Sequence, residues 1–285
     1  MQYKLGIIGG TGIYDLEGIK VRERVLPDTP YGKASGEFII GELYGKEVVF
    51  LPRHGKGHHI APTFINYRAN IYGMKRLGVT HLISISAVGS FKDELNPGSI
   101  VFVDQYVDRT KERVHDTFFD EGVAVHIAFA DPVCPSLHAK LIEIAKELGI
   151  DYAPWGTYLN IEGPAFSTRA ESRLYRSWGM DVIGMTSLYE AKLAREAEMH
   201  FAPIAQVTDC DSWKEESVDV AVVLGNLGKA LTITRAVIRK FIEEFPYPAS
   251  SCACETALRG ALVTDPAVIP DLLKKKYELL LNKYL

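Results

Sequence analysis

The chain has 285 residues, of which 47% are hydrophobic and 24% charged, and its net charge is −4. This is the composition of a globular protein with enough apolar material for a large core, and it argues against disorder and against a broad nucleic-acid-binding surface. The longest apolar stretch, residues 218–238, is interrupted by Asp219, Lys229 and Arg235, so we expect no membrane span. Met1 leads almost directly into an apolar run, and we therefore expect no signal peptide and a cytoplasmic location.

The first predicted element is a short buried strand that ends in glycines. Residues 5–8 are apolar and partly β-branched, and Gly9-Gly10-Thr11-Gly12 follows at once. Glycines there expose backbone N–H groups, which together with the Thr11 hydroxyl can hold an anion. A plain turn is the alternative, because the spacing fits neither the dinucleotide-binding fingerprint nor the P-loop.

Strands and helices are predicted to alternate along the rest of the chain. Further strands are expected at 37–43, 47–51, 80–86, 99–104, 156–161, 181–184 and 200–208. Helices are expected at 66–77, 135–148, 168–178, 188–198, 219–245 and 271–284. This order predicts one α/β domain over residues 1–285, a sandwich with a central mixed, largely parallel β-sheet flanked by helices. Ligands of such sheets bind at the carboxyl ends of the strands.

Polar residues gather at those predicted strand ends. Arg53 offers a planar fork that matches phosphate, and His54 beside it can add another donor. With Thr11, Ser86 and Thr186 at neighbouring strand ends, they predict an oxyanion site.

Two further patterns suit a bound planar base. Phe166-Ser167 precedes a predicted helix and could stack on a ring, although a core phenylalanine beside a helix cap is the simpler interpretation. Asp209 and Asp211 follow a strand, and such a pair can share a proton or protonate a leaving group. A solvated acidic loop is the alternative for this pair.

Cysteine and histidine patterns predict neither a disulfide framework nor a metal site. Four cysteines are too few for a secreted framework, and Cys134 and Cys210 are isolated in the sequence. Cys252-Ala-Cys254 could form only a strained, reducible disulfide, so two reduced thiols are favoured. Three histidines lie within residues 54–59, but their spacing matches no metal motif, and we expect no metal.

Taken together, these stretches resemble purine nucleoside phosphorylases of the trimeric kind, and most closely those that act on 5′-methylthioadenosine. The resemblance spans residue 6 to about residue 215 and rests on motifs whose order and spacing make chance improbable. The motifs are GIIGGTGIYD, RHGKGHHIAPTFINYRANI, SAVGS, NPGSIVFVDQYVDRT, DPVCP, IEGPAFSTRAES, GMTS and TDCDSWKE. The C-terminal third is similar to the family less specifically.

The resemblance implies phosphorolysis of the N-glycosidic bond of 5′-methylthioadenosine. Inorganic phosphate, a co-substrate, would displace the purine and give adenine and 5-methylthioribose 1-phosphate. No cofactor, nucleic acid or membrane partner is implied, and the chain would assemble as a trimer or a dimer of trimers.

The resemblance also implies site residues. Phosphate contacts match Thr11, Arg53, His54, Ser86, Ala87 and Thr186. Nucleoside contacts match Met185 at the ribose, Phe166 and Ser167 at the base, His58 near the 5′ group, and Val218 and Val222 as an apolar slot for the methylthio group. Ordinary helix packing is the alternative for the two valines. His126 matches a residue that is donated across the trimer interface.

Asp209, with Asp211, matches the carboxylates that face the purine. Enzymes of this fold that take guanosine and inosine usually carry Asn at the position of Asp209. A carboxylate accepts a hydrogen bond from a 6-amino group and, when protonated, donates to N7. We therefore expect a preference for 6-aminopurines, with Asp209 as the general acid.

One departure from the family pattern concerns the ribose end. Tyr189 stands where the family commonly has Pro, so the loop that carries Met185 is expected to differ in shape. A broader purine nucleoside or methylthioinosine phosphorylase stays open as an alternative. A non-catalytic nucleoside-binding protein is the alternative from another class, and dinucleotide binding is the weakest.

Overall fold

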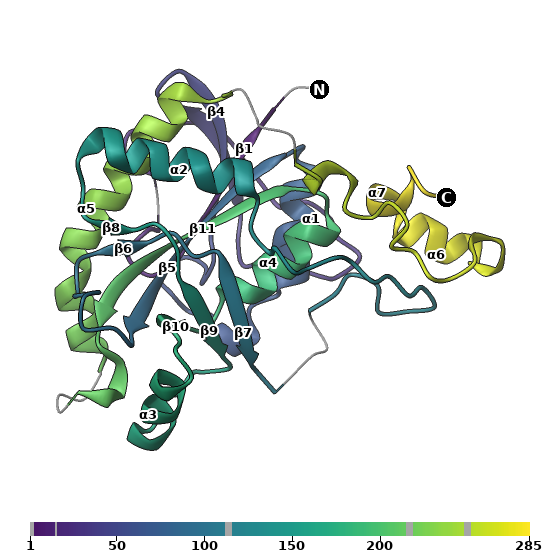
Figure 1. The fold of residues 1–285 in the computed structure, drawn as a ribbon. Coiled ribbons are helices and arrows are strands. Elements are labelled where there is room, and N and C mark those ends of the chain that lie inside the picture. Colours follow the sequence, from purple (N-terminus) through teal and green to yellow (C-terminus); the bar gives the residue numbers. More distant parts are fainter. Residues whose placement is uncertain (1–2, 15, 112–115, 215–218, 248–251) are drawn as a thin grey trace.

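An eleven-stranded sheet runs through the computed structural model of the chain (Figure 1). The structure describes residues 3–14, 16–111, 116–214, 219–247 and 252–285. Along the sheet the order is β2 (Lys20–Val25), β3 (Phe38–Leu43), β4 (Lys46–Pro52), β1 (Leu5–Gly9), β5 (His81–Ser90), β10 (Val182–Gly184), β9 (Thr157–Ile161) and β7 (Gln105–Arg109). The other edge of β5 pairs with β11 (His200–Asp209), which leads to β6 (Ile100–Val101) and β8 (Tyr152–Ala153).

Helices cover both faces of this sheet (Figure 1). One face carries α1 (Tyr67–Arg76) and α4 (Ser187–Glu196), and the other carries α2 (Pro135–Leu148) and α5 (Val220–Glu244). The smaller helices are α3 (Arg169–Ser177), α6 (Asp271–Lys276) and α7 (Glu278–Leu281), with 3₁₀ turns η1 (Pro62–Phe64), η2 (Asp211–Trp213), η3 (Cys254–Thr256) and η4 (Pro266–Val268). Parallel pairing predominates, as in β1–β4, β1–β5, β5–β11 and β9–β10, while β2–β3–β4 is antiparallel. The predicted fold class is confirmed.

The two core layers follow from the two-residue period of the strands. In β1, Leu5 and Ile7 pack with residues of α2 and α5, whereas Ile8 packs with residues of α1 and α4. A fully buried central strand therefore reads as a continuous apolar run in the sequence, which is why it was recognisable.

Helix α5 is 25 residues long. By length and composition it is the one helix of the described residues that could cross a membrane. In the fold its Leu227, Val237 and Phe241 are buried, the latter two in the core between α2 and the sheet. These three side chains thus belong to the interior of the fold.

Several element boundaries differ from the sequence prediction. The strand expected at 80–86 continues to Ser90, because β11 pairs with it along its other edge. The expected C-terminal helix is divided at Tyr277, whose buried hydroxyl accepts a hydrogen bond from the Glu121 N–H. Strand β2, which the sequence did not predict, is an exposed edge strand rich in charged residues. It lacks the alternation of apolar and polar residues that predicts a half-buried strand.

Candidate active site

The main cavity lies where the sheet has a local gap. On one edge of β5, β1 pairs only as far as Ser84, and β10 pairs from Gly89 onward. The stretch between them, including Ser86 and Ala87, therefore has no strand beside it on that edge, and a cavity of about 440 Å³ opens there. This volume is typical of small-molecule sites, which span about 300–1,000 Å³.

Most of the predicted site residues line this cavity. They are Thr11, Arg53, His54, His58, Ser86, Ala87, Phe166, Ser167, Met185, Thr186, Asp209 and Asp211. Ser86 and Ala87 lie inside β5 and not at its end. They still face the cavity, because no strand pairs with this edge of β5 beside them.

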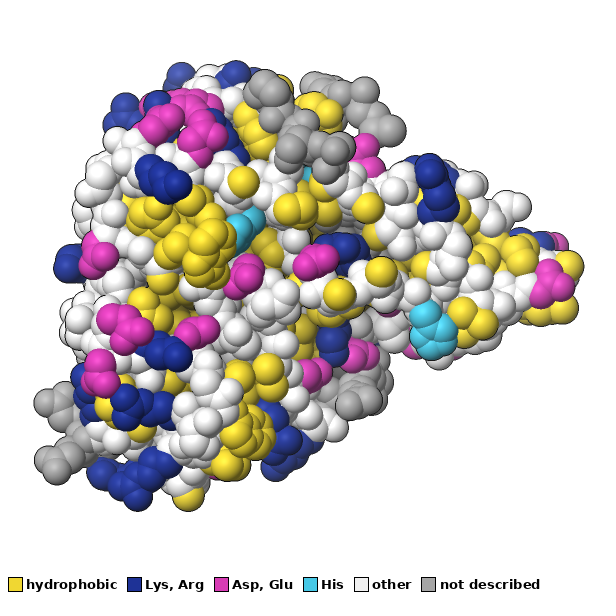
Figure 2. Space-filling view, viewed as in Figure 1, with side chains coloured by type: hydrophobic (Ala, Val, Ile, Leu, Met, Phe, Trp, Pro, Cys, Tyr) yellow, Lys and Arg dark blue, Asp and Glu magenta, His cyan; other side chains and the backbone are white. Residues whose placement is uncertain are grey.

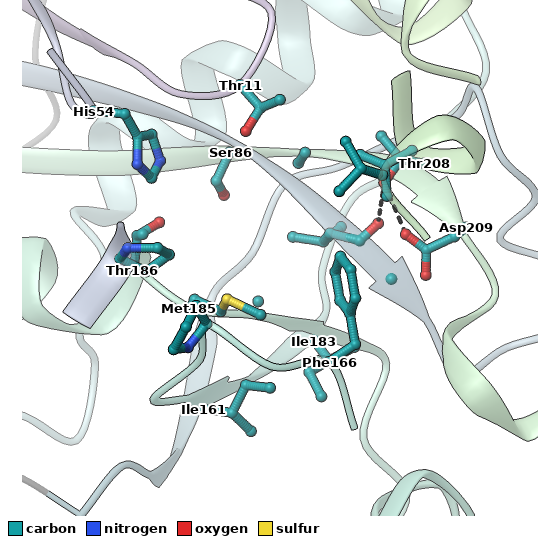
Figure 3. Close-up of a pocket in the computed structure, with 18 of the residues that line it drawn as sticks. Thr11, His54, Ser86, Ile161, Phe166, Ile183, Met185, Thr186, Thr208 and Asp209 are labelled. Atoms are coloured by element: carbon teal, nitrogen blue, oxygen red, sulfur yellow. Dashed lines mark hydrogen bonds between the residues drawn. The ribbon is translucent and has the colours of Figure 1, made fainter. Parts of the chain in front are cut away.

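One end of the cavity gathers hydroxyl groups (Figure 3). Thr11 follows β1, Ser86 comes from β5, and Thr186 is the N-cap of α4, with no capping bond from its side chain. The buried Ser86 Oγ has no hydrogen-bond partner among the described residues. Hydroxyls together with a helix N-terminus favour an anion at this end.

Gly10 is required by the close approach of this loop to the sheet. A Cβ atom at Gly10 would lie 2.5 Å from both Arg53 Nη1 and the Ile85 carbonyl oxygen. The loop can therefore reach the anion end only with glycine at this position.

Arg53 is held differently from the prediction of a free phosphate fork. Its side chain is fully buried, and Glu190 takes both arms, through Nε to Oε1 at 2.5 Å and Nη2 to Oε2 at 3.0 Å. Ser84 Oγ accepts from Nη2 at 2.7 Å and the Ile85 carbonyl from Nη1 at 2.9 Å. Within the described part of the chain, these bonds leave one of the five guanidinium N–H groups, on Nη1, for a ligand. The expectation of a bidentate Arg53–phosphate contact does not fit this geometry, because Glu190 occupies the fork.

His54 also differs from its predicted role as a donor. Burial and the neighbouring Arg53 lower the pKa of His54 to about 3, so its ring is neutral at pH 7. Nδ1 lies 2.8 Å from the Ile60 carbonyl oxygen and must carry the proton to donate there. Nε2 is then an acceptor, suited to a ligand hydroxyl and not to a bare phosphate oxygen.

Asp209 stands at the other end of the cavity (Figure 3), and Asp211 also lines the cavity. Asp209 ends β11, and its Oδ2 accepts from Thr208 Oγ1 at 2.9 Å while its Oδ1 accepts from the Asp211 N–H at 2.8 Å. Gly89 faces this pair, since a Cβ atom there would lie 2.7 Å from Asp209 Oδ1. The bulge of β11 between Val207 and Asp209 turns the carboxylate toward the cavity side of the sheet.

Both carboxyl groups hold their protons more tightly than usual. Burial raises the pKa of Asp209, and burial together with the charge of Asp209 raises the pKa of Asp211 to about 6. Asp211 Oδ2 has no hydrogen-bond partner in the described part of the structure. The pair is thus suited to carry a proton near neutral pH.

Apolar side chains join the two ends. Phe166, Met185, Ile161 and Ile183 lie along the cavity in Figure 3, and the Phe166 side chain is 41% exposed. The Ser167 Oγ is buried without a partner among the described residues. A planar group can therefore rest on Phe166 with a hydroxyl nearby.

At the anion end, His58 closes the rim. It stacks on His54, with ring centroids 4.1 Å apart, and its Nδ1 lies 3.1 Å from the Tyr14 hydroxyl. His58 has a positive φ of 56°. This backbone conformation is uncommon outside glycine and is often found at functional sites.

Of the two predicted valines, only Val222 is among the described residues and can be compared with the cavity lining. Val222 does not line it, because the first turns of α5 present Val220, Val223 and Leu224 instead. Val218 falls outside the described residues.

His126 lies away from this cavity in the single chain. It lines a second hollow with Phe119 and Phe129, and its N–H donates to the Ala261 carbonyl. The chain alone does not bring His126 to the site.

Glu190 and Tyr189 both lie on α4. Glu190 was missed because the run SLYEAKLARE looks like a solvated helix with paired charges, and only the tertiary fold shows that Glu190 is fully buried. Tyr189 belongs to the first turn of α4 and stacks on Tyr67 at 5.0 Å, while Met185 still lines the cavity.

Comparison with known proteins identifies the family of the chain. Residues 4–243 match the phosphorylase superfamily, and the chain belongs to that superfamily.

Several relatives share the name S-methyl-5′-thioadenosine phosphorylase. S-methyl-5′-thioadenosine phosphorylase of Geobacter sulfurreducens is 49% identical over the full length of both chains. The protein of that name from Thermofilum pendens is 46% identical, over 91% of this chain and 98% of its own. The resemblance inferred from the motifs is confirmed.

Solved structures of similar fold carry related names. A methylthioadenosine phosphorylase from an antarctic soil metagenomic library superposes with a TM-score of 0.89 at 41% identity, over 98% of each chain. A variant of adenosine/methylthioadenosine phosphorylase from Schistosoma mansoni, in complex with methylthioadenosine, gives 0.79 at 32% identity, over 99% of this chain and 98% of its own.

Proposed function

We propose that this chain transfers the methylthioribosyl group of 5′-methylthioadenosine to inorganic phosphate, releasing adenine. The observation that carries the proposal is a single cavity with hydroxyl donors at one end and a protonatable carboxyl pair at the other. A nucleoside lying between them places its sugar beside the anion and its base beside Asp209. The names and bound ligands of the relatives support this substrate.

The anion end suits the attacking phosphate. Thr11, Ser86 and Thr186 offer hydroxyls, and the Ala87 backbone borders the same space. With its Nε2 as acceptor, His54 suits a ribose hydroxyl or a protonated phosphate oxygen. Holding both reactants in one orientation supplies much of the rate enhancement.

The carboxyl end suits the leaving base. As the bond from C1′ to the purine nitrogen breaks, a C1′–oxygen bond to phosphate forms and negative charge develops on the base. A proton from Asp209, aided by Asp211, to N7 makes adenine a neutral leaving group. Both groups are raised in pKa, which favours the protonated form that this step requires.

The 5′ group is assigned to the first turns of α5. Val220 and Leu224 are 64% and 53% exposed, and with Val223 they give the cavity an apolar wall. A methylthio group would bury this surface, whereas a 5′-hydroxyl would not.

We further propose a trimer or a dimer of trimers in the cytoplasm, in purine and methionine salvage. In Figure 2 the projection that carries α6 shows hydrophobic side chains on its surface, and Val268 and Leu272 there are 68% and 78% exposed. Such a surface suits a subunit interface. His126 lies on the segment that pairs with this projection, through the Val125–Leu262 bridge, and it is exposed on the surface of the single chain. The reaction needs phosphate as co-substrate and no cofactor.

A substrate panel tests the reaction. Methylthioadenosine, adenosine, inosine and guanosine are each incubated with and without phosphate, and free base is measured. Phosphate-dependent release that is fastest for methylthioadenosine supports the proposal. Faster release from inosine favours the broader nucleoside phosphorylase, and binding without any release identifies a nucleoside-binding protein.

Asp209→Asn tests the role of the carboxylate. We expect a loss of about 100-fold or more in kcat/KM for methylthioadenosine, within the range for removing a general acid, and little loss for inosine. Asp151→Asn, an exposed carboxylate between α2 and β8 that does not line the cavity, is the matched control. An equal loss on both substrates contradicts the assignment.

The shared site is tested by dilution. Activity per chain should fall as the oligomer dissociates, followed by sedimentation, and His126→Ala should weaken nucleoside binding. A fully active monomer rules out a contribution from His126 of a neighbour.

A further inference from the structure

A second group of reactive side chains lies outside the cavity. Cys134 is the N-cap of α2, His200 begins β11, and Cys252 and Cys254 lie at η3. One ligand atom from each of these residues lies within 4.8 Å of all the others. Three of the four cysteines of the chain thus meet one histidine.

The spacing of these atoms is that of a tetrahedral metal site. Cys134 Sγ lies 3.8 Å from Cys252 Sγ, and each of these sulfurs lies 3.3 Å from His200 Nδ1. Zinc bonds of ~2.3 Å to sulfur and ~2.0 Å to nitrogen give tetrahedral edges of roughly 3.8 Å between sulfurs and 3.5 Å between sulfur and nitrogen. A disulfide needs ~2.05 Å, and all four cysteines are free.

The surroundings of His200 orient it for metal binding. Its Nε2 lies 3.2 Å from Glu255 Oε1. When Nε2 carries the ring proton and donates it to this carboxylate, the Nδ1 lone pair faces the sulfurs. A histidine oriented by a carboxylate is the usual arrangement around zinc. His81 stacks on the other side of the ring at 4.2 Å.

Three of the four cluster residues are shielded from solvent, and Cys252 is partly buried. Cys134, Cys254 and His200 are 1%, 2% and 4% exposed. Four protein ligands leave no open coordination position, which is the mark of a structural and not a catalytic site.

We propose that Cys134, His200, Cys252 and Cys254 bind one structural Zn²⁺. Three thiols each give up a proton as their sulfurs bond to the metal, no electron is transferred, and the neutral imidazole is the fourth ligand. The site fastens the C-terminal segment from Cys252 onward to α2 and β11. The expectation of no metal is thereby revised: the ligands come from three distant parts of the chain, so no local motif announces them.

Metal content tests the proposal directly. The full-length protein, purified and reconstituted with Zn²⁺ under reducing conditions, should hold about one zinc per chain by mass spectrometry of the metal. Cys252→Ser and Cys134→Ser should lose it, and Cys210→Ser, which removes the one cysteine outside the cluster, should keep it. Co²⁺ in place of Zn²⁺ should give thiolate-to-cobalt charge transfer and the visible bands of tetrahedral cobalt.

A second measurement avoids variants that fail to fold. Chelation of the wild-type protein should increase proteolytic cleavage and hydrogen exchange within residues 252–285, and added Zn²⁺ should reverse both. No bound metal after reconstitution, or equal zinc in Cys210→Ser and Cys252→Ser, overturns the proposal. The proposal is also overturned if protein kept under reducing conditions has the intact mass of a chain with a disulfide among Cys134, Cys252 and Cys254.

Discussion

Replacing Asp211 by Asn should stabilise the fold at neutral and alkaline pH while lowering activity. The Asp211 carboxyl is buried, its Oδ2 has no partner among the described residues, and Asp209 lies beside it. Asn keeps the shape, tolerates the positive φ of 44° at this position, and carries no charge to bury. Burying the ionised Asp211 carboxylate therefore lowers the free energy of unfolding, and the neutral amide removes this destabilisation.

The size of the effect follows from the pKa of Asp211. Folding raises this pKa from 3.8 to about 6, so the folded chain binds the proton more tightly than the unfolded chain. The stabilisation that protonation gives is complete below pH 4 and is lost as the pH rises through 6. At 1.36 kcal/mol per pKa unit, the loss at pH 8 amounts to about 3 kcal/mol.

The assay is urea unfolding of the wild-type protein and of Asp211→Asn from pH 4 to pH 8, at one protein concentration because oligomers unfold in a concentration-dependent way. The two free energies of unfolding should nearly coincide at pH 4, and the variant should gain up to about 3 kcal/mol by pH 8. The exposed Asp151→Asn should show no such trend. A constant offset between the proteins, or a variant less stable at pH 8, refutes the reasoning.

Two other predictions concern groups that line or support the cavity. Glu190→Gln leaves the buried Arg53 charge without its counter-ion and should cost about 3–5 kcal/mol in unfolding experiments. If enough protein folds, the phosphate KM should fall, because a negative charge near the anion end is gone; an unchanged phosphate KM and stability contradict this. Phe166→Ala should raise the nucleoside KM about 5- to 150-fold, since stacking a base is worth about 1–3 kcal/mol, and should leave the phosphate KM unchanged. Phe64→Ala, 79% exposed outside the cavity, is its control, and equal effects of the two would rule out stacking.

Local patterns in the sequence predicted most of the fold. The helix at 135–148 is observed with the expected bounds, because Pro135 begins it and Gly149 ends it in the left-handed conformation. The central strands were visible because they are buried on both faces. Because ligands bind at the strand ends of such sheets, the polar residues after the predicted strands were expected to form one site. Most of them do line one cavity.

Contacts between distant parts of the chain could not be predicted in this way. The Arg53–Glu190 pair joins residues 137 positions apart, and it decides how much of the guanidinium a ligand can reach. The proton position on His54 depends on the Ile60 carbonyl, which only the turn between them brings close. Which valines of α5 face the cavity depends on the rotation of that helix, which its mixed apolar composition leaves open.

The interrupted edge of β5 has a consequence for how this site can diversify. The anion end is made of backbone and short side chains on the innermost strands, so an insertion or a shift there would disturb the register of the whole sheet. The wall formed by Val220, Val223 and Leu224 stands on the outer end of a helix, where side chains can be exchanged without moving a strand. Under the proposed function, the anion end would stay the same among related proteins. Substitutions in the α5 wall would change which nucleoside is preferred.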